Sequence, residues 1–315
     1  MTRRDMILAA AVATAWGLNF LVIDWGMAGI PPLLFVAVRF AVVAVFVIVV
    51  PRPVASWKTV VGVGLFMSLG QFGLLYTSMA LGLQPGLAAL LLQAQAVFTV
   101  FIAALVLRER PTSGQAAGVV LGLIGLAVVA VGRGGEAPAV AVVLALAAAL
   151  SWAIGNVISR RAGVVTGRGR LGALSLTVWS ATVVPLPALA LSFAVEGPAA
   201  VSAGLAGFGP AAALSTLYTA GLCTLVGYAV FNGLLARNPS AAVVPWVLLA
   251  PVVAMSAAGL LLGDIPTPAE IGGGALLVMG VLITALPPRA LRRRSRRTRS
   301  AAAVHRVTRE RPARD

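Results

Sequence analysis

The sequence predicts an all-α membrane protein with ten transmembrane helices, arranged as two five-helix repeats of opposite orientation. Three observations predict this fold class: an apolar composition, a series of apolar runs of membrane-spanning length, and motifs that recur in the second half of the chain. Of the 315 residues, 60% are hydrophobic and only 10% are charged, whereas soluble domains carry about 25% charged residues. Water therefore cannot be the main solvent of this chain.

Each expected span is an apolar run between charged residues or breaks rich in proline and glycine. A helix needs about 20 mainly apolar residues to cross a bilayer. The runs that meet this condition are 6–25, 31–50, 59–81, 86–107, 114–132, 139–159, 172–194, 210–235, 240–262 and 270–286. The loops between them are too short for a separate soluble domain, so any function must reside among the helices.

Positive charges in the loops predict the orientation, because arginine and lysine accumulate in cytoplasmic loops. One side of the membrane would carry Arg3, Arg4, Arg52, Lys58, Arg108, Arg110, Arg160, Arg161, Arg168, Arg170 and Arg237, and the other only Arg133. Both termini are therefore expected in the cytoplasm. The ratio of 23 arginines to one lysine suggests a high-GC bacterial genome, which predicts the bacterial inner membrane as the location.

Recurring motifs divide the chain into two halves. A shift of 155 residues aligns Glu109 with Asp264, Pro111-Thr112 with Pro266-Thr267, Gln115 with Glu270, Gly118 with Gly273, and Gly125 with Gly280. The expected boundaries are 1–135 for the first repeat, 136–288 for the second, and 289–315 for a disordered cytoplasmic tail. Because each half holds an odd number of spans, the second copy would be inverted in the membrane, as in transporters with alternating access.

The net charge of +15 does not indicate a nucleic-acid partner. The segment from Arg289 to Asp315 holds eleven arginines and two acidic residues, and therefore accounts for nine of the fifteen excess charges. A basic run that follows an apolar segment indicates a tail that contacts membrane lipid. The single cysteine, Cys223, and the single histidine, His305, offer neither a metal site nor a catalytic pair. The sequence thus predicts no cofactor and no enzyme.

Polar side chains within spans are few and must face protein or a wet cavity. Trp16 and Asn19 share a helix face, as do Trp152 and Asn156, and the repeat would bring these faces to one cavity. Gln93 and Gln95 point about 200° apart on a continuous helix, so only one is expected to face that cavity fully. The candidate substrate-binding residues are Trp16, Asn19, Gln71, Gln93, Gln95, Trp152, Asn156, Tyr228 and Asn232. Each amide could equally form an interhelical hydrogen bond, worth about 0.6 to 2 kcal/mol.

Arg39 is the charged residue deepest in a predicted span, where insertion costs about 2.5 to 3.5 kcal/mol. It is either a counter-charge for a substrate carboxylate, or a group that caps helix carbonyls or snorkels to the membrane surface. No carboxylate lies at that depth: Asp24 is near the outer end of its span and Glu109 near the inner end of another. Proton coupling through Asp24, exchange and facilitated efflux therefore all remain open.

Five stretches resemble the EamA group of the drug/metabolite transporter superfamily: WGLNFLVIDWG (16–26), PPLLFVAVRF (31–40), GLAALLLQAQAVFTV (86–100), LSWAIGNVISRR (150–161) and LTVWSA (176–181). The resemblance implies a ten-helix basket whose central cavity is lined mainly by spans 1, 3, 4, 6, 8 and 9. It also implies export of small amino-acid metabolites similar to O-acetylserine or cysteine. Other amino acids, amphipathic drugs or a broad substrate set are the alternatives within transport, and a non-transporting membrane interaction protein is the alternative outside it. The tail and the weak acidic motif around Asp264 depart from the family pattern.

Overall fold

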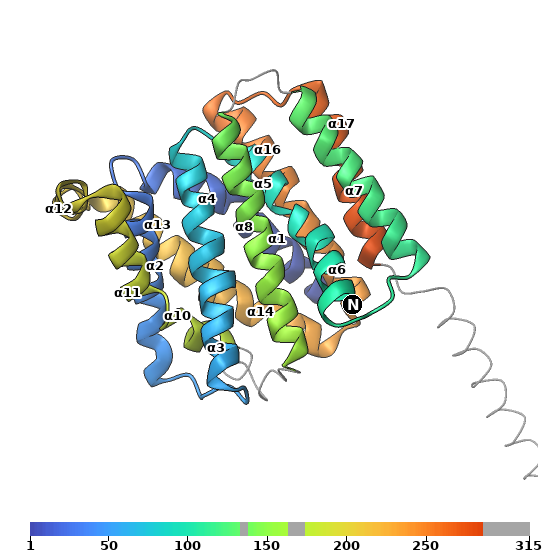
Figure 1. Cartoon of the computed structure of the whole chain (residues 1–315), viewed down its shortest axis with the longest axis horizontal. Helices are drawn as coiled ribbons and strands as arrows, with labels where there is room; N and C mark the ends of the chain where they lie inside the picture. The colour runs from blue at the N-terminus through green and yellow to red at the C-terminus, as the bar shows by residue number, and fades with distance from the viewer. Residues whose placement is uncertain (133–137, 163–173, 286–315) are drawn as a thin grey trace, which may run out of the picture.

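The computed structural model describes residues 1–132, 138–162 and 174–285, and within these ranges it contains helices and no strand. The first half comprises α1 (Arg3–Gly26), α2 (Pro32–Val45), α3 (Trp57–Val63), α4 (Gln71–Ala80), α5 (Pro85–Leu92), α6 (Ala94–Val106) and α7 (Ser113–Gly132). The second half comprises α8 (Ala139–Arg161), α10 (Ser175–Ala181), α11 (Pro185–Leu191), α12 (Pro198–Ala206), α13 (Pro210–Thr216), α14 (Gly227–Arg237), α15 (Ser240–Val243), α16 (Leu249–Leu262) and α17 (Pro268–Ala285). Figure 1 shows these helices packed as one bundle. The predicted tail 289–315 and three loop arginines, Arg133, Arg168 and Arg170, lie outside the described residues.

Several spans consist of two or three helical segments joined without a loop. The connecting segments are the 3₁₀ helices η1 (Phe46–Ile48) and η5 (Val244–Leu248) and the π-helices η2 (Gly64–Gly70), η3 (Ser192–Glu196) and η4 (Leu217–Val226). In the described part of the chain, eight helical stretches are long and apolar enough to cross a membrane, and two apolar helices, Pro32–Ile48 and Pro268–Thr284, are shorter. By length and composition, the described part of the chain therefore supports eight of the ten predicted spans.

The short helix α12 was not predicted, because its sequence of small residues lies between two apolar runs. Its first residue is Pro198, which suits the first turn of a helix. The preceding Gly197 has φ +89°, a left-handed backbone conformation that favours glycine. The chain can therefore turn sharply from η3 into α12.

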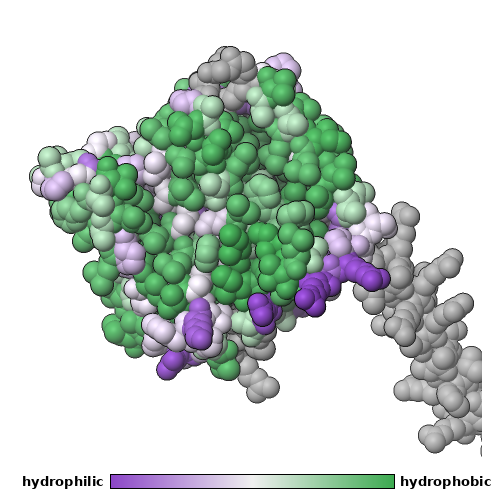
Figure 2. Space-filling view, in the orientation of Figure 1, coloured by the Kyte–Doolittle hydropathy of each residue, from purple (hydrophilic) through white to green (hydrophobic). Residues whose placement is uncertain are grey.

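The surface of the bundle is suited to lipid. Figure 2 shows a mostly hydrophobic side, with hydrophilic residues gathered towards one edge. Ile48, Leu260 and Ile265 are each more than 80% exposed, which would be unfavourable in water but is expected against hydrocarbon tails. The fold is therefore that of a multi-pass membrane protein.

Helices α7 and α17 pack side by side and antiparallel (Figure 1). A β-carbon built on Gly118 would lie 2.5 Å from the carbonyl oxygen of Gly280, and one built on Gly125 would lie 2.5 Å from that of Gly273. Glycine is thus required for the close approach of the two backbones. The four glycines that the 155-residue shift aligned are thus the residues at which these helices meet, and they meet crosswise, Gly118 with Gly280 and Gly125 with Gly273.

The same two helices begin with matching caps. The backbone N–H of Thr112 donates to Oε1 of Gln115, and the N–H of Gln115 donates to the Thr112 hydroxyl. Thr267 and Glu270 form the corresponding pair of bonds at the start of α17. Each is a capping box that satisfies donors left free in the first turn.

The π-helices η2 and η4 lie in the third span of each half, and each receives a hydrogen bond from the first helix of the other half. Nε1 of Trp16 on α1 donates to the carbonyl of Cys223 in η4 at 3.0 Å. The Ser151 hydroxyl on α8 donates to the carbonyl of Phe66 in η2 at 2.8 Å. π-Helical turns interrupt the regular hydrogen-bond pattern of an α-helix, and they often occur at functional sites. Both irregular segments are therefore tied to the opposite half of the molecule.

Candidate binding cavity

A cavity of about 430 Å³ lies between helices of both halves. Eight of the nine candidate substrate-binding residues line it, and so does Arg39. The eight are Trp16, Asn19, Gln71, Gln93, Gln95, Trp152, Asn156 and Tyr228. Asn232 instead lines a second cavity of about 420 Å³.

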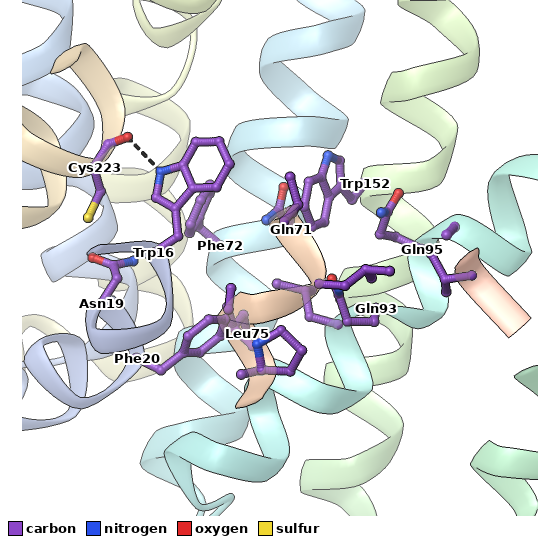
Figure 3. A pocket seen from close by; sticks show the side chains of 18 of the residues that line it. Trp16, Asn19, Phe20, Gln71, Phe72, Leu75, Gln93, Gln95, Trp152 and Cys223 are labelled. Carbon is purple, nitrogen blue, oxygen red and sulfur yellow. Dashed lines mark hydrogen bonds between the residues drawn. The ribbon is translucent and has the colours of Figure 1, made fainter. Parts of the chain in front are cut away.

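Gln71 and Gln93 present their amide groups to the first cavity. Their residues are only 5% and 6% exposed, yet neither side chain forms a hydrogen bond within the described part of the chain. The polar atoms of both amides keep some accessible surface, since neither amide is among the fully buried atoms without a partner. This surface faces the cavity that the two residues line. Figure 3 shows Gln71 between Trp16 and Trp152, with Gln93 below them in this view. These amides are therefore free to bind a polar solute.

Gln93 and Gln95 both line the cavity, although only one of them was expected to face it fully. The regular α-helix is interrupted at Gln93, since α5 ends at Leu92 and α6 begins at Ala94. Gln95 also accepts a hydrogen bond from Nδ2 of Asn156 on α8 at 3.0 Å. It thus makes the contact to a neighbouring helix that the sequence predicts for one of the two glutamines.

Trp16 forms an aromatic wall of the cavity. Its ring centroid lies 5.4 Å from that of Tyr228 and 5.3 Å from that of Phe231. The bond to the Cys223 carbonyl fixes the orientation of the indole (Figure 3). The neighbouring Asn19 is 8% exposed, and its Oδ1 has no partner among the described residues. The planes of Tyr228 and Phe231 are inclined to the indole by 50° and 61°, and the three rings together offer apolar surface to a small solute.

Arg39 is 3% exposed and points from α2 towards the bundle interior. Its guanidinium donates to the hydroxyl of Tyr76 and, at 3.1 Å, to that of Thr224. It also lies over the ring of Phe72, 4.1 Å from the centroid, a favourable cation–π geometry. Among the described residues no carboxylate pairs with Arg39, and its Nε has no acceptor. The observed partners are side-chain hydroxyls, so neither carbonyl capping nor snorkelling describes this arginine.

Thr224, Phe72 and the break at Gln93 were missed by sequence reasoning. Threonine and phenylalanine are common in membrane spans, and neither carries a signal that links it to Arg39, 185 residues away in the case of Thr224. No cluster of three His, Cys, Asp or Glu side chains suited to a metal occurs in the described ranges.

The profile of the EamA-like transporter family matches residues 4–131 and 139–286. A protein of Salmonella typhimurium named "Probable amino-acid metabolite efflux pump" is 38% identical over 286 residues, covering 90% of this chain and 95% of that protein. The Escherichia coli protein of the same name is 35% identical with the same coverage. A "Probable terminal-alkyne amino-acid exporter" of Streptantibioticus cattleyicolor is 32% identical over 63% of each chain. One solved crystal structure aligns with a TM-score of 0.57 at 21% identity, over 92% of this chain and 99% of that one, which concerns the fold alone.

Proposed function

Because the chain belongs to the EamA-like transporter family, we propose that it exports small amino-acid metabolites, similar to O-acetylserine or cysteine, across the bacterial inner membrane. The observation that carries this proposal is the first cavity, where two unpaired glutamine amides, a wall of aromatic rings and a buried arginine surround about 430 Å³. Such a space accommodates a small solute with both polar and apolar parts. The names of the Salmonella typhimurium and Escherichia coli relatives indicate the same class of solute.

The proposed mechanism is alternating access between two inverted five-helix repeats, 1–135 and 136–288, with both termini in the cytoplasm. Three features support it: two separate segments of the chain match the same family profile, the aligned glycines of α7 and α17 meet antiparallel, and each half carries a π-helix in its third span that is bonded to the other half. Two inverted halves around one cavity can rock to expose it to either side.

The substrate-binding residues in this proposal are Trp16, Asn19, Gln71, Gln93, Gln95, Trp152, Asn156 and Tyr228, which line the first cavity, with Asn232 in the second and Arg39 in both. The aromatic rings would contact the apolar part of the solute. The amides would bind its polar groups, and Arg39 would be the counter-charge of its carboxylate.

Transport into proteoliposomes that contain the purified protein tests the proposal. Labelled cysteine and O-acetylserine are expected to move faster than in liposomes without protein, and faster than a cationic amphipathic drug. A variant with Gln71→Leu and Gln93→Leu, which removes both free amides, is expected to lose most of this transport while remaining folded. Absence of transport of any amino acid by folded wild-type protein would refute the proposal. Faster movement of the drug would favour the broader alternative.

A further inference from the structure

Arg39 lies where the two cavities adjoin. Together with Phe72, Asn156 and Tyr228, it lines both the first cavity and the second. The second cavity extends to Ser159 and Arg160 at the C-terminal end of α8, which is the end predicted to face the cytoplasm. A solute that moves from this second cavity into the first therefore passes the Arg39 guanidinium.

The charge of Arg39 is not neutralised by the protein around it. The contacts of its guanidinium are neutral: two hydroxyls and an aromatic ring. Arg160, the other arginine of the second cavity, is already paired with Glu109 at 2.9 Å and is mostly exposed. Arg39 is thus the buried charge that a solute would encounter at the junction.

We propose that Arg39 selects solutes by charge, admitting those with a free carboxylate and disfavouring cations that lack one. Charges interact about four times more strongly near protein, where the effective dielectric constant is about 20, than in water. A carboxylate can also accept two parallel hydrogen bonds from a guanidinium. This proposal rests on the proposed export function. Amphipathic amines without a carboxylate should accordingly be poor solutes for this protein.

Competition between two matched solutes tests the selectivity. S-methyl-L-cysteine and its methyl ester differ only in the carboxylate, and the assay is run at about pH 6, where the protonated amine makes the ester a cation. Each is used to inhibit the transport of labelled cysteine in proteoliposomes. With the wild-type protein, half-inhibition by the ester is expected to require about a tenfold higher concentration than half-inhibition by the acid. In Arg39→Gln the two concentrations should differ by less than about twofold, and Arg39→Lys should keep a preference for the acid. Equal inhibition in the wild type would overturn the proposal.

Arg237→Gln provides the matched control, because it removes the same charge from a site at the C-terminal end of α14. Arg237 lies outside both cavities, is 61% exposed and pairs with Asp5 at 3.5 Å. The ratio of inhibitory concentrations should be unchanged in this variant. A change as large as that in Arg39→Gln would show a general effect of charge and would contradict a specific role of Arg39.

A labelling experiment tests the same selectivity without transport. Cys223 is the only cysteine of the chain, so Cys223→Ser with Ala96→Cys leaves one thiol on the wall of the first cavity. The rates of modification by an anionic and a cationic methanethiosulfonate reagent are compared with and without Arg39→Gln. Loss of Arg39 should lower the ratio of anionic to cationic rates about tenfold, and an unchanged ratio would overturn the proposal. If no amino acid is transported, the proposed function fails, but this ratio still decides the role of Arg39.

Discussion

Gly272 and Gly273 are neighbours on α17 with different surroundings, so replacement by alanine should have opposite effects at the two positions. A β-carbon at Gly273 would lie 2.6 Å from the carbonyl oxygen of Gly125 and 2.7 Å from Cγ2 of Val129 on α7. At Gly272 no atom lies within 4 Å of the added carbon. The two substitutions therefore change helix propensity equally, but only one of them disturbs the contact between α7 and α17.

The expected magnitudes follow from these distances. Ordinary contacts of a β-carbon begin at 3.4 Å, so Gly273→Ala must push the two helices apart by several tenths of an ångström. Overpacking of this kind typically costs about 1 to 3 kcal/mol. In a membrane such a cost matters, because helix association depends on close van der Waals packing. Gly272→Ala should instead stabilise the helix by about 0.4 to 1 kcal/mol, since it restricts the unfolded chain.

The assay is thermal unfolding in detergent, followed by the fraction of protein that remains monodisperse after heating. One kcal/mol corresponds to a shift of roughly 2 °C in the midpoint for a chain of this size. Gly273→Ala is therefore expected to unfold several degrees below Gly272→Ala. Where unfolding is irreversible, the rate of inactivation at one temperature replaces the midpoint. Equal midpoints, or a lower midpoint for Gly272→Ala, would refute the glycine contact between α7 and α17.

Two further predictions compare matched residues. Gln71→Leu should reduce cysteine transport about tenfold without lowering the melting midpoint, because its amide has no protein partner to lose. Gln95→Leu should lower the midpoint, since it removes the 3.0 Å bond from Asn156 and leaves that Nδ2 only the longer, 3.4 Å contact with the Thr99 hydroxyl. The reverse pattern would contradict the assignment of the free amide. Thr112→Ala and Thr267→Ala should each destabilise the protein by about 1 kcal/mol in the same melting assay, because each threonine forms a capping box of the same kind. Unequal losses would count against the equivalence of α7 and α17.

The sequence predicts the parts of the fold that depend on long apolar runs. The uninterrupted helices α1 and α8 lie within a few residues of the expected 6–25 and 139–159. The segmented spans were not predicted, because a π-helical turn adds one residue to the helix without changing its apolar character. For this reason η2 and η4 carry no clear signal in the sequence, although they supply the carbonyls bonded by Ser151 and Trp16.

The cavity was predictable to the extent that its residues are rare in membrane spans. Glutamine and asparagine are costly in hydrocarbon, so their presence selected six of the nine candidates, and the structure brings five of these six to one cavity. The surroundings of Arg39 were not predictable in this way. Its partner Thr224 lies on the opposite half of the chain, and a threonine hydroxyl can satisfy itself on its own helix, as Thr224 also does with the carbonyl of Thr219.

The neutral surroundings of Arg39 have a physical consequence for transport. An aspartate opposite the guanidinium would form a buried ion pair, and a solute carboxylate would then have to displace a partner fixed in the protein. Two hydroxyls and the ring of Phe72 offset part of the cost of burying the charge of Arg39. Because these partners are neutral, the positive charge can still attract an anionic group in the cavity. Because a transporter must release its solute as well as bind it, hydroxyl partners that can reclaim the guanidinium after the solute leaves are better suited to the task than a carboxylate. Under the proposed function, the lack of an ion pair at Arg39 in the described structure would meet the same requirement as the free amides of Gln71 and Gln93, because each leaves a polar group available to a solute that binds and leaves.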